Sequence, residues 1–197
     1  MNLPNRLTIL RILLVPVIVL VWIFPYAQFG IDLGVLQFSY VKLPILNIIC
    51  LVLFSLASIT DFLDGYIARS KHLVTTFGKF ADPIADKLLV NTMLILFASS
   101  NLIPVVPVVL MLGRDTIVDG CRMIAGKNGV VVAAGYLGKV KTVAQMFTII
   151  FVLLNNLPFE LYSIPFTDVI LWFATFVSIA SGTSYFMQLK DYIFESM

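Results

Sequence analysis

The sequence predicts an all-α integral membrane protein, a single domain over residues 1–197 built as a bundle of six transmembrane helices with cytoplasmic N- and C-termini. Three observations predict this fold class. Hydrophobic residues make up 60% of the chain and charged residues only 12%, with a mean hydropathy of +1.01. The charged residues are clustered, and almost all Lys and Arg residues fall on one predicted side. A chain of this length has too little interior to bury so much apolar surface in water.

The charge-free stretches define the helices. They cover residues 12–31, 43–60, 88–113, 142–159 and 169–189. A helix needs about 20 apolar residues to cross a bilayer core of roughly 30 Å. The 88–113 stretch is too long for one span, and Ser99-Ser100-Asn101, Pro104 and Pro107 interrupt it. A turn there yields six helices. In chain order we expect them at residues 7–26, 43–69, 83–100, 104–124, 138–156 and 166–188.

The basic residues predict the orientation. With the N-terminus inside, twelve of the thirteen Lys and Arg residues face the cytoplasm, and only Lys42 lies on the other side. An excess of Lys and Arg is typical of the cytoplasmic loops of membrane proteins. We therefore expect a multi-pass protein of the cell membrane whose chemistry faces the cytoplasm. The net charge of +2 gives no reason to expect a nucleic-acid partner. Aromatic residues, Tyr185 among them, are expected at the membrane interfaces.

Four carboxylates carry the main functional signal. Asp61, Asp64, Asp82 and Asp86 are four of only eleven acidic residues. A carboxylate near hydrocarbon is costly, and four together repel one another, so the cluster needs countercharge. A divalent cation is the simplest supplier. The i,i+3 and i,i+4 spacings place each pair on one helical face. Four carboxylates at this point can hold two metal ions; the alternative is a set of solvated helix caps.

The helix boundary between the two pairs follows from a proline. Asp82 precedes Pro83, which suits an N-cap followed by proline at the first helical position. We therefore expect residues 70–81 to form a turn that brings the two pairs face to face.

The residues around these acids form a continuous motif. The segment contains Asp61, Asp64, Gly65, Ala68, Arg69, Gly78, Asp82 and Asp86. It resembles the D-x2-D-G-x2-A-R-x8-G-x3-D-x3-D signature of the CDP-alcohol phosphatidyltransferases, and all eight fixed positions match. That family has a six-helix membrane fold, and the resemblance points to a homodimer.

The resemblance also implies roles for individual residues. Asp61, Asp64 and Asp82 are implied to bind two Mg²⁺ or Mn²⁺ ions, with Asp86 close to the metals as general base. Asn5 and Thr8, which share a helical face with Arg11, are implied to approach the nucleotide; the alternative is a capping or interfacial role. The implied set for CDP-diacylglycerol is Asn5, Thr8, Asp61, Gly65, Arg69 and Gly78.

A second group of residues concerns the acceptor. Arg114, Arg122, Lys139 and Lys141 are four cations that suggest an anionic second substrate. The alternative is that they serve topology or phospholipid headgroup binding. Their local sequences resemble the bacterial branch of the family that makes phosphatidylglycerophosphate from glycerol-3-phosphate. That branch usually has Glu where this chain has Asp115.

The resemblance implies a phospholipid-biosynthesis reaction. The phosphatidyl group passes from CDP-diacylglycerol to sn-glycerol-3-phosphate, with phosphatidylglycerophosphate and CMP as products. Two alternatives remain: the same chemistry with another acceptor, such as an inositol phosphate or serine, and a cation transporter. Transporters usually place their acids near the membrane midplane, whereas these four fall at predicted helix ends.

Overall fold

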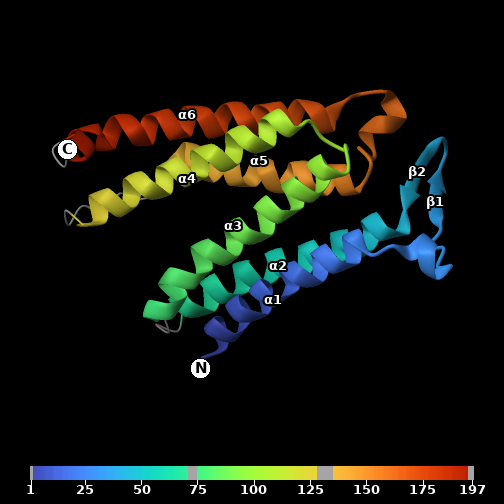
Figure 1. Cartoon of the computed structure of the whole chain (residues 1–197), viewed down its shortest axis with the longest axis horizontal. Helices are drawn as coiled ribbons and strands as arrows, with labels where there is room; N and C mark the ends of the chain where they lie inside the picture. Colours follow the sequence, from blue (N-terminus) through green and yellow to red (C-terminus); the bar gives the residue numbers. More distant parts are fainter. Residues whose placement is uncertain (1, 71–74, 128–134, 195–197) are drawn as a thin grey trace. The chain divides into compact units, whose positions relative to one another are not determined.

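Six long helices account for most of the described chain (Figure 1). The computed structural model describes residues 2–70, 75–127 and 135–194. Each helix overlaps one of the predicted helices, which agrees with the all-α class. In chain order they are α1 (Leu3–Ile23), α2 (Ile45–Ser70), α3 (Thr76–Ser99), α4 (Val105–Lys127), α5 (Tyr136–Leu153) and α6 (Phe166–Phe194).

The chain divides into two compact units. The first unit comprises Met1–Phe97 and Ile149–Ile164, and the second comprises Ala98–Thr148 and Pro165–Met197. Helices α3 and α5 each contribute residues to both units.

Helices α1 and α2 run side by side in opposite directions in the first unit (Figure 1). The side chain of Asn2 caps α1 by accepting the Asn5 N–H at 3.2 Å, and a proline fills the first turn. Both features are favourable at a helix N-terminus. Ile18, Cys50 and Phe54 are buried in this unit. The start of α1 therefore lies at the same end as the end of α2 (Figure 1).

A short hairpin that the sequence did not predict follows α1. The hairpin consists of the antiparallel strands β1 (Val35–Phe38) and β2 (Val41–Pro44). The short 3-10 helix η1 (Tyr26–Phe29) precedes it. The Tyr40 hydroxyl donates to the Glu160 carbonyl, next to η2 (Phe159–Tyr162), and Asn155 Nδ2 donates to the Lys42 carbonyl at 2.7 Å. Each strand has only four residues, too few for a clear alternation pattern, so the segment resembles a loop in the sequence.

Helix α3 begins earlier than predicted. The prediction made Asp82 the N-cap, but the helix starts at Thr76, and Pro83 lies inside it. The reason is a different cap: Thr75 Oγ1 accepts the Gly78 N–H at 3.0 Å. Asp82 and Asp86 still share one face of α3, because their spacing within a helix is unchanged.

Helices α4 and α6 pack side by side in the second unit (Figure 1). Met111 and Val118 of α4 are buried, as are Leu171 and Val177 of α6. Asn101, with a φ of +57°, lies in the turn before α4, where the sequence predicted a break.

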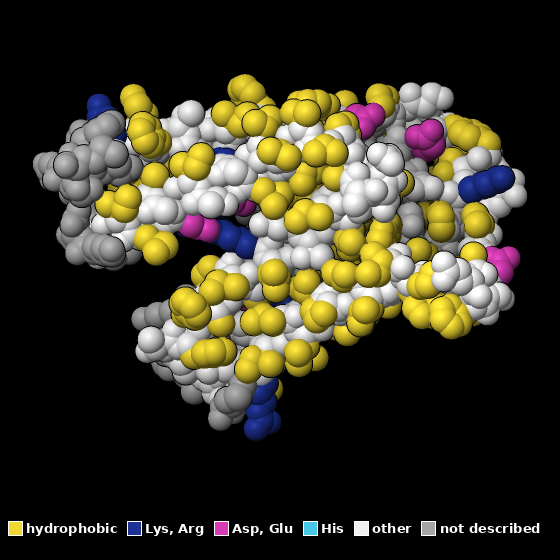
Figure 2. Space-filling view, viewed as in Figure 1, with side chains coloured by type: hydrophobic (Ala, Val, Ile, Leu, Met, Phe, Trp, Pro, Cys, Tyr) yellow, Lys and Arg dark blue, Asp and Glu magenta, His cyan; other side chains and the backbone are white. Residues whose placement is uncertain are grey.

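Apolar side chains cover much of the surface (Figure 2). Leu13, Phe62 and Phe176 are 59%, 70% and 72% exposed. Among the described residues, α1, α2, α5 and α6 contain segments long and apolar enough to cross a membrane. Charged residues at 79–87 and 114–127 make α3 and α4 more polar. Such exposed surface requires lipid rather than water, and the chain is a membrane protein.

Candidate active site

Helix α1 supplies one face of an acidic cluster, which we define as Asp61, Asp64 and Asp82 with Thr8 and Arg11. Thr8 and Arg11 lie one helical turn apart and are 1% and 0% exposed. They share the predicted face with Asn5, which is also buried.

Arg11 binds two of the aspartates. Its Nη1 lies 2.5 Å from Asp61 Oδ1, and its Nη2 lies 2.5 Å from Asp64 Oδ2. Asp64 is itself only 2% exposed, whereas the Asp61 side chain is 36% exposed. A buried charge is tolerated only when it is paired. Here the positive charge of Arg11 is paired with the negative charges of Asp61 and Asp64.

Thr8 links the aspartates of α2 to those of α3. Its hydroxyl lies 2.7 Å from Asp82 Oδ1 and 3.4 Å from Asp64 Oδ2. A hydroxyl carries one proton, so we assign the donation to Asp82, the shorter contact. The carboxylates of Asp64 and Asp82 therefore both lie close to one hydroxyl group. Asp86 lies one turn further along α3 and is partly exposed.

Gly78 lets α1 approach α3. A Cβ at this position would lie 3.3 Å from Thr75 Oγ1 and 3.4 Å from Asn5 Oδ1. Thr75 Oγ1 also donates to Asn5 Oδ1 at 2.9 Å, so the capping residue of α3 fixes Asn5. Gly65 follows Asp64 directly on α2. Arg69 lies in the last turn of α2, and its side chain is outside the described part of the structure.

The donor chemistry of the cluster fits a hard divalent cation, because carboxylate oxygens are the ligands that Mg²⁺ and Mn²⁺ prefer. Within residues 2–70, 75–127 and 135–194, no three acidic, His or Cys side chains lie close enough to hold a metal ion. The Arg11 guanidinium supplies the countercharge to Asp61 and Asp64. The sequence prediction named a divalent cation as the simplest source of this countercharge and did not include Arg11 among the site residues.

A second cluster lies on α4 and α5. We define the cationic cluster as Arg114, Arg122, Lys139 and Lys141. Asp115 lies among them: it accepts from Lys141 Nζ at 2.5 Å and from Arg114 Nη1 at 2.8 Å. Lys141 is 5% exposed, whereas Lys139 is exposed. The ammonium group of Lys141 is therefore directed at Asp115, which is itself buried.

Helix α6 holds the two arginines. Arg114 Nη2 donates to Ser181 Oγ at 2.6 Å, and Arg122 Nη2 donates to the Tyr185 hydroxyl at 2.7 Å. Tyr185 is 4% exposed, so its side chain packs inside the protein. Sequence reasoning missed Ser181 and Tyr185 as partners, because nothing in a local pattern pairs residues more than sixty positions apart.

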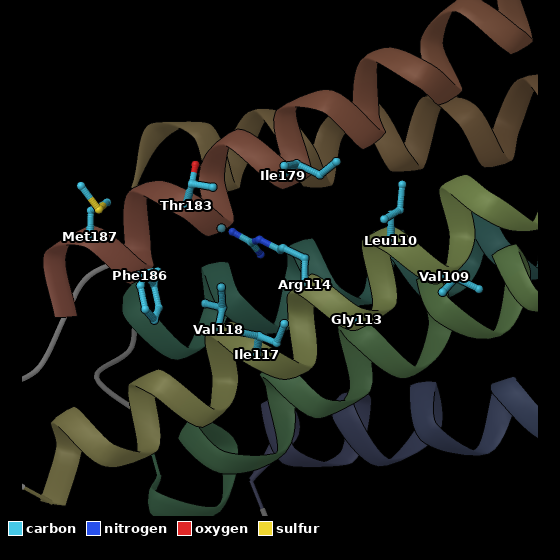
Figure 3. A pocket seen from close by; sticks show the side chains of 11 residues that line it. Val109, Leu110, Gly113, Arg114, Ile117, Val118, Ile179, Thr183, Phe186 and Met187 are labelled. Atoms are coloured by element: carbon cyan, nitrogen blue, oxygen red, sulfur yellow. The ribbon is translucent and has the colours of Figure 1, made fainter. Parts of the chain in front are cut away.

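A pocket of about 500 Å³ adjoins Arg114 between α4 and α6 (Figure 3). In Figure 3 the Arg114 side chain extends from α4 towards α6, with Val118 and Ile179 among the surrounding apolar residues. These walls lower the local dielectric around the guanidinium, which strengthens its interaction with an anion.

Comparison with known proteins identifies the family. The sequence model of the CDP-alcohol phosphatidyltransferase family matches residues 1–180. The chain belongs to this family. A protein of Bacillus subtilis named CDP-diacylglycerol–glycerol-3-phosphate 3-phosphatidyltransferase is 44% identical, over 94% of this chain and 93% of its own length. Proteins with the same name from Rickettsia bellii and Pseudomonas fluorescens are 39% and 32% identical, covering 97% and 96% of this chain and 97% and 88% of their own lengths.

Membership agrees with the signature read from the sequence. CDP-alcohol phosphatidyltransferases are generally dependent on divalent cations. Three of the four signature aspartates in this CDP-alcohol phosphatidyltransferase gather around Thr8 and Arg11.

Proposed function

We propose that this CDP-alcohol phosphatidyltransferase transfers the phosphatidyl group of CDP-diacylglycerol to sn-glycerol-3-phosphate, releasing CMP and forming phosphatidylglycerophosphate. The observation that carries the proposal is the near full-length identity of up to 44% to relatives named for this reaction. The gathering of the signature aspartates in the acidic cluster supports it. The acceptor oxygen forms a bond to the phosphorus that bears the diacylglycerol, and the bond from that phosphorus to the CMP oxygen breaks.

Asp61, Asp64, Asp82 and Asp86 would hold two divalent cations, Mg²⁺ or Mn²⁺. When bound, these cations would neutralise charge on the pyrophosphate and on the departing CMP. Asp86 serves as the general base that accepts the proton of the acceptor hydroxyl. Its place one turn beyond Asp82 on the same face of α3, with a partly exposed side chain, supports this role.

In this proposal the CDP-diacylglycerol is bound by six residues of the first unit: Asn5, Thr8, Asp61, Gly65, Arg69 and Gly78. The close approach at Gly78 and the Thr75–Asn5 hydrogen bond support it, since both fix a polar α1 side chain against α3. A rigid polar surface of this kind lowers the entropy cost of binding the nucleotide.

Arg114, Arg122 and Lys139 bind the phosphate of glycerol-3-phosphate. Lys141 acts indirectly, because its ammonium is engaged by Asp115. A phosphate monoester is close to a dianion near neutral pH, and a guanidinium matches its paired oxygens. Asp115 contacts both Lys141 and Arg114 and offsets one positive charge, so a net charge of three remains in the cationic cluster to balance the acceptor phosphate.

We further propose the membrane arrangement. All six helices cross the cell membrane, both termini and both clusters face the cytoplasm, and residues 1–197 act as one catalytic domain in a homodimer with phospholipids around it. The distribution of basic residues supports the orientation, since only Lys42 would lie outside.

The test incubates the purified chain with CDP-diacylglycerol, Mg²⁺ and one acceptor at a time, and measures released CMP. The acceptors are glycerol-3-phosphate, inositol phosphate, serine and glycerol. We expect release with glycerol-3-phosphate, loss of activity in excess chelator, and recovery with Mg²⁺ or Mn²⁺. A preference for serine or glycerol would refute the proposal that the acceptor carries a phosphate. Full activity in excess chelator would refute the proposal that the reaction requires divalent cations.

A further inference from the structure

Tyr185 lies at the centre of the cationic cluster without being charged itself. The residue belongs to α6, is 4% exposed, and contacts groups from α4 and from the start of α5. Its hydroxyl accepts from Arg122 Nη2 at 2.7 Å and from the Gly135 N–H at 2.6 Å. One oxygen therefore fixes both a guanidinium and the backbone just before α5, the helix that carries Lys139.

The ring of Tyr185 faces two positive charges. The guanidinium carbon of Arg122 lies 4.7 Å from the ring centroid, and that of Arg114 lies 5.7 Å from it. Both distances are within the range in which an aromatic face attracts a cation. Two guanidinium groups near each other repel, and the negative face of the ring offsets part of that repulsion.

Ser181 completes the arrangement one turn earlier on α6. It accepts from Arg114 Nη2 at 2.6 Å, so residues 181 and 185 hold one arginine each. The next residue, Gly182, leaves room for the Arg114 stem: a Cβ there would lie 2.7 Å from Arg114 Cγ. Helix α6 is thus shaped to fix the arginines of α4.

The two arginines retain donors for a ligand. In the described structure, the Nε atoms of Arg114 and Arg122 are buried and make no hydrogen bond. A buried donor without an acceptor is costly, and the oxygens of a bound phosphate would relieve that cost.

We propose that Tyr185 is a positioning residue that holds Arg114, Arg122 and the start of α5 ready to bind the phosphate of the acceptor alcohol. The inference rests on the proposed function, which assigns that phosphate to the cationic cluster. Tyr185 acts through the arginines and the α5 backbone rather than by touching the reacting atoms. Fixing long side chains before the ligand arrives lowers the entropy cost of binding.

The test compares Tyr185→Phe, Tyr185→Leu and the control Tyr136→Phe in the purified full chain. Tyr136 is the next residue after Gly135 but is 80% exposed. Phe removes only the hydroxyl, and a hydrogen bond to a charged group is worth roughly a factor of ten in affinity. We expect the glycerol-3-phosphate KM to rise about tenfold in Tyr185→Phe and further in Tyr185→Leu. The CDP-diacylglycerol KM and kcat should change by less than about twofold, and Tyr136→Phe should match the unmodified chain.

The outcomes separate this inference from the proposed function. CMP release from glycerol-3-phosphate by the unmodified chain, with an unchanged KM in Tyr185→Phe, overturns the role of Tyr185 alone. Equal increases in both KM values also overturn it, because they indicate a general structural role. Absence of the reaction with any phosphate-bearing acceptor refutes the proposed acceptor and the inference together. If the Tyr185 variants do not fold, Ser181→Ala tests the same arrangement through Arg114, with the same expected split between the two KM values.

Discussion

Arg11 is a charged side chain with no exposed surface, held between the carboxylates of Asp61 and Asp64. In a bilayer such a group is stable only when its charge is matched. Asp64 is nearly as deeply buried as Arg11, so neither residue has water as an alternative partner. At the residue scale, the acidic cluster is therefore organised around a built-in cation.

Arg11→Met should destabilise the protein strongly. The substitution leaves Asp64 buried and unpaired, and breaking a buried ion pair by removing one partner costs about 3–5 kcal/mol. The measurement is the free energy of unfolding in detergent micelles. Arg6→Met is the matched control, because Arg6 lies on the same helix with an exposed side chain.

Added Mg²⁺ should stabilise the Arg11→Met variant more than the unmodified chain. A divalent cation at the aspartates would replace the missing countercharge, and a ligand that binds only the folded state raises its stability. Equal stabilisation of both proteins by Mg²⁺ would show that Arg11 and the metal do not share these carboxylates.

Asp86→Asn should abolish most turnover while preserving shape. General-base catalysis typically contributes a factor of about 10² to 10⁴, so kcat should fall by at least about a hundredfold. Binding of CDP-diacylglycerol should be partly retained. Single-turnover CMP release checks this result, with Asp168→Asn in the exposed first turn of α6 as the control. Normal turnover in Asp86→Asn would exclude its role as base.

At the element scale, two glycines of the second unit differ in what surrounds them. At Gly182 of α6 a Cβ would clash with the Arg114 stem, whereas Gly113 of α4 has open space where a Cβ would lie. Both line the pocket beside Arg114, and Figure 3 shows Gly113 on α4. Substituting each glycine by alanine therefore distinguishes a steric effect on Arg114 from a change in helix propensity.

Gly182→Ala should raise the glycerol-3-phosphate KM several-fold, and Gly113→Ala should not. The added methyl group of Gly182→Ala would lie 2.7 Å from Arg114 Cγ, so the arginine must shift away from Ser181. Both substitutions add the same helix propensity of roughly 1 kcal/mol. Steady-state kinetics with each substrate varied in turn checks the difference. Equal KM values in the two variants would show that Arg114 tolerates displacement.

The sequence predicted the positions of the helices well, but it did not predict the side-chain contacts between them. Charge-free stretches located six helices, and among the described residues α1, α2, α5 and α6 are long and apolar enough to cross a membrane. The start of α3 was wrong because Asp82-Pro83 matches a common helix start, whereas the Thr75 cap depends on backbone geometry. In the candidate site, periodicity identified the shared face of Asn5 and Thr8. The contacts of Arg11 and Tyr185 could not be predicted, since they join segments far apart in sequence.

At the scale of the whole molecule, exposed apolar side chains and clustered basic residues together determine how the chain meets the bilayer. The proposed orientation places the β1–β2 hairpin outside and the loops that carry basic residues inside. Gln37 lies on the exposed strand of the hairpin, and Gly126 is exposed near the end of α4. These two positions report on opposite sides of the membrane.

Single cysteines should therefore label with opposite sidedness. After replacement of Cys50 and Cys121, Gln37→Cys should react with a membrane-impermeant maleimide added to intact cells. Gly126→Cys should react only after the membrane is opened. Gel-shift detection of the label checks both positions. Labelling of Gly126→Cys in intact cells would contradict the proposed orientation.

The burial of Arg11 also has a consequence for biosynthesis. Arg11 lies in α1, which leaves the ribosome before α2 and its aspartates exist. Until α2 follows, the guanidinium is an isolated charge close to the middle of an apolar helix that runs from Leu3 to Ile23, and it must reach the headgroup region for water. Pairing with Asp61 and Asp64 becomes available only when both helices have been inserted. We therefore expect stable insertion of α1 to depend on α2, because α2 supplies the carboxylates that pair with Arg11.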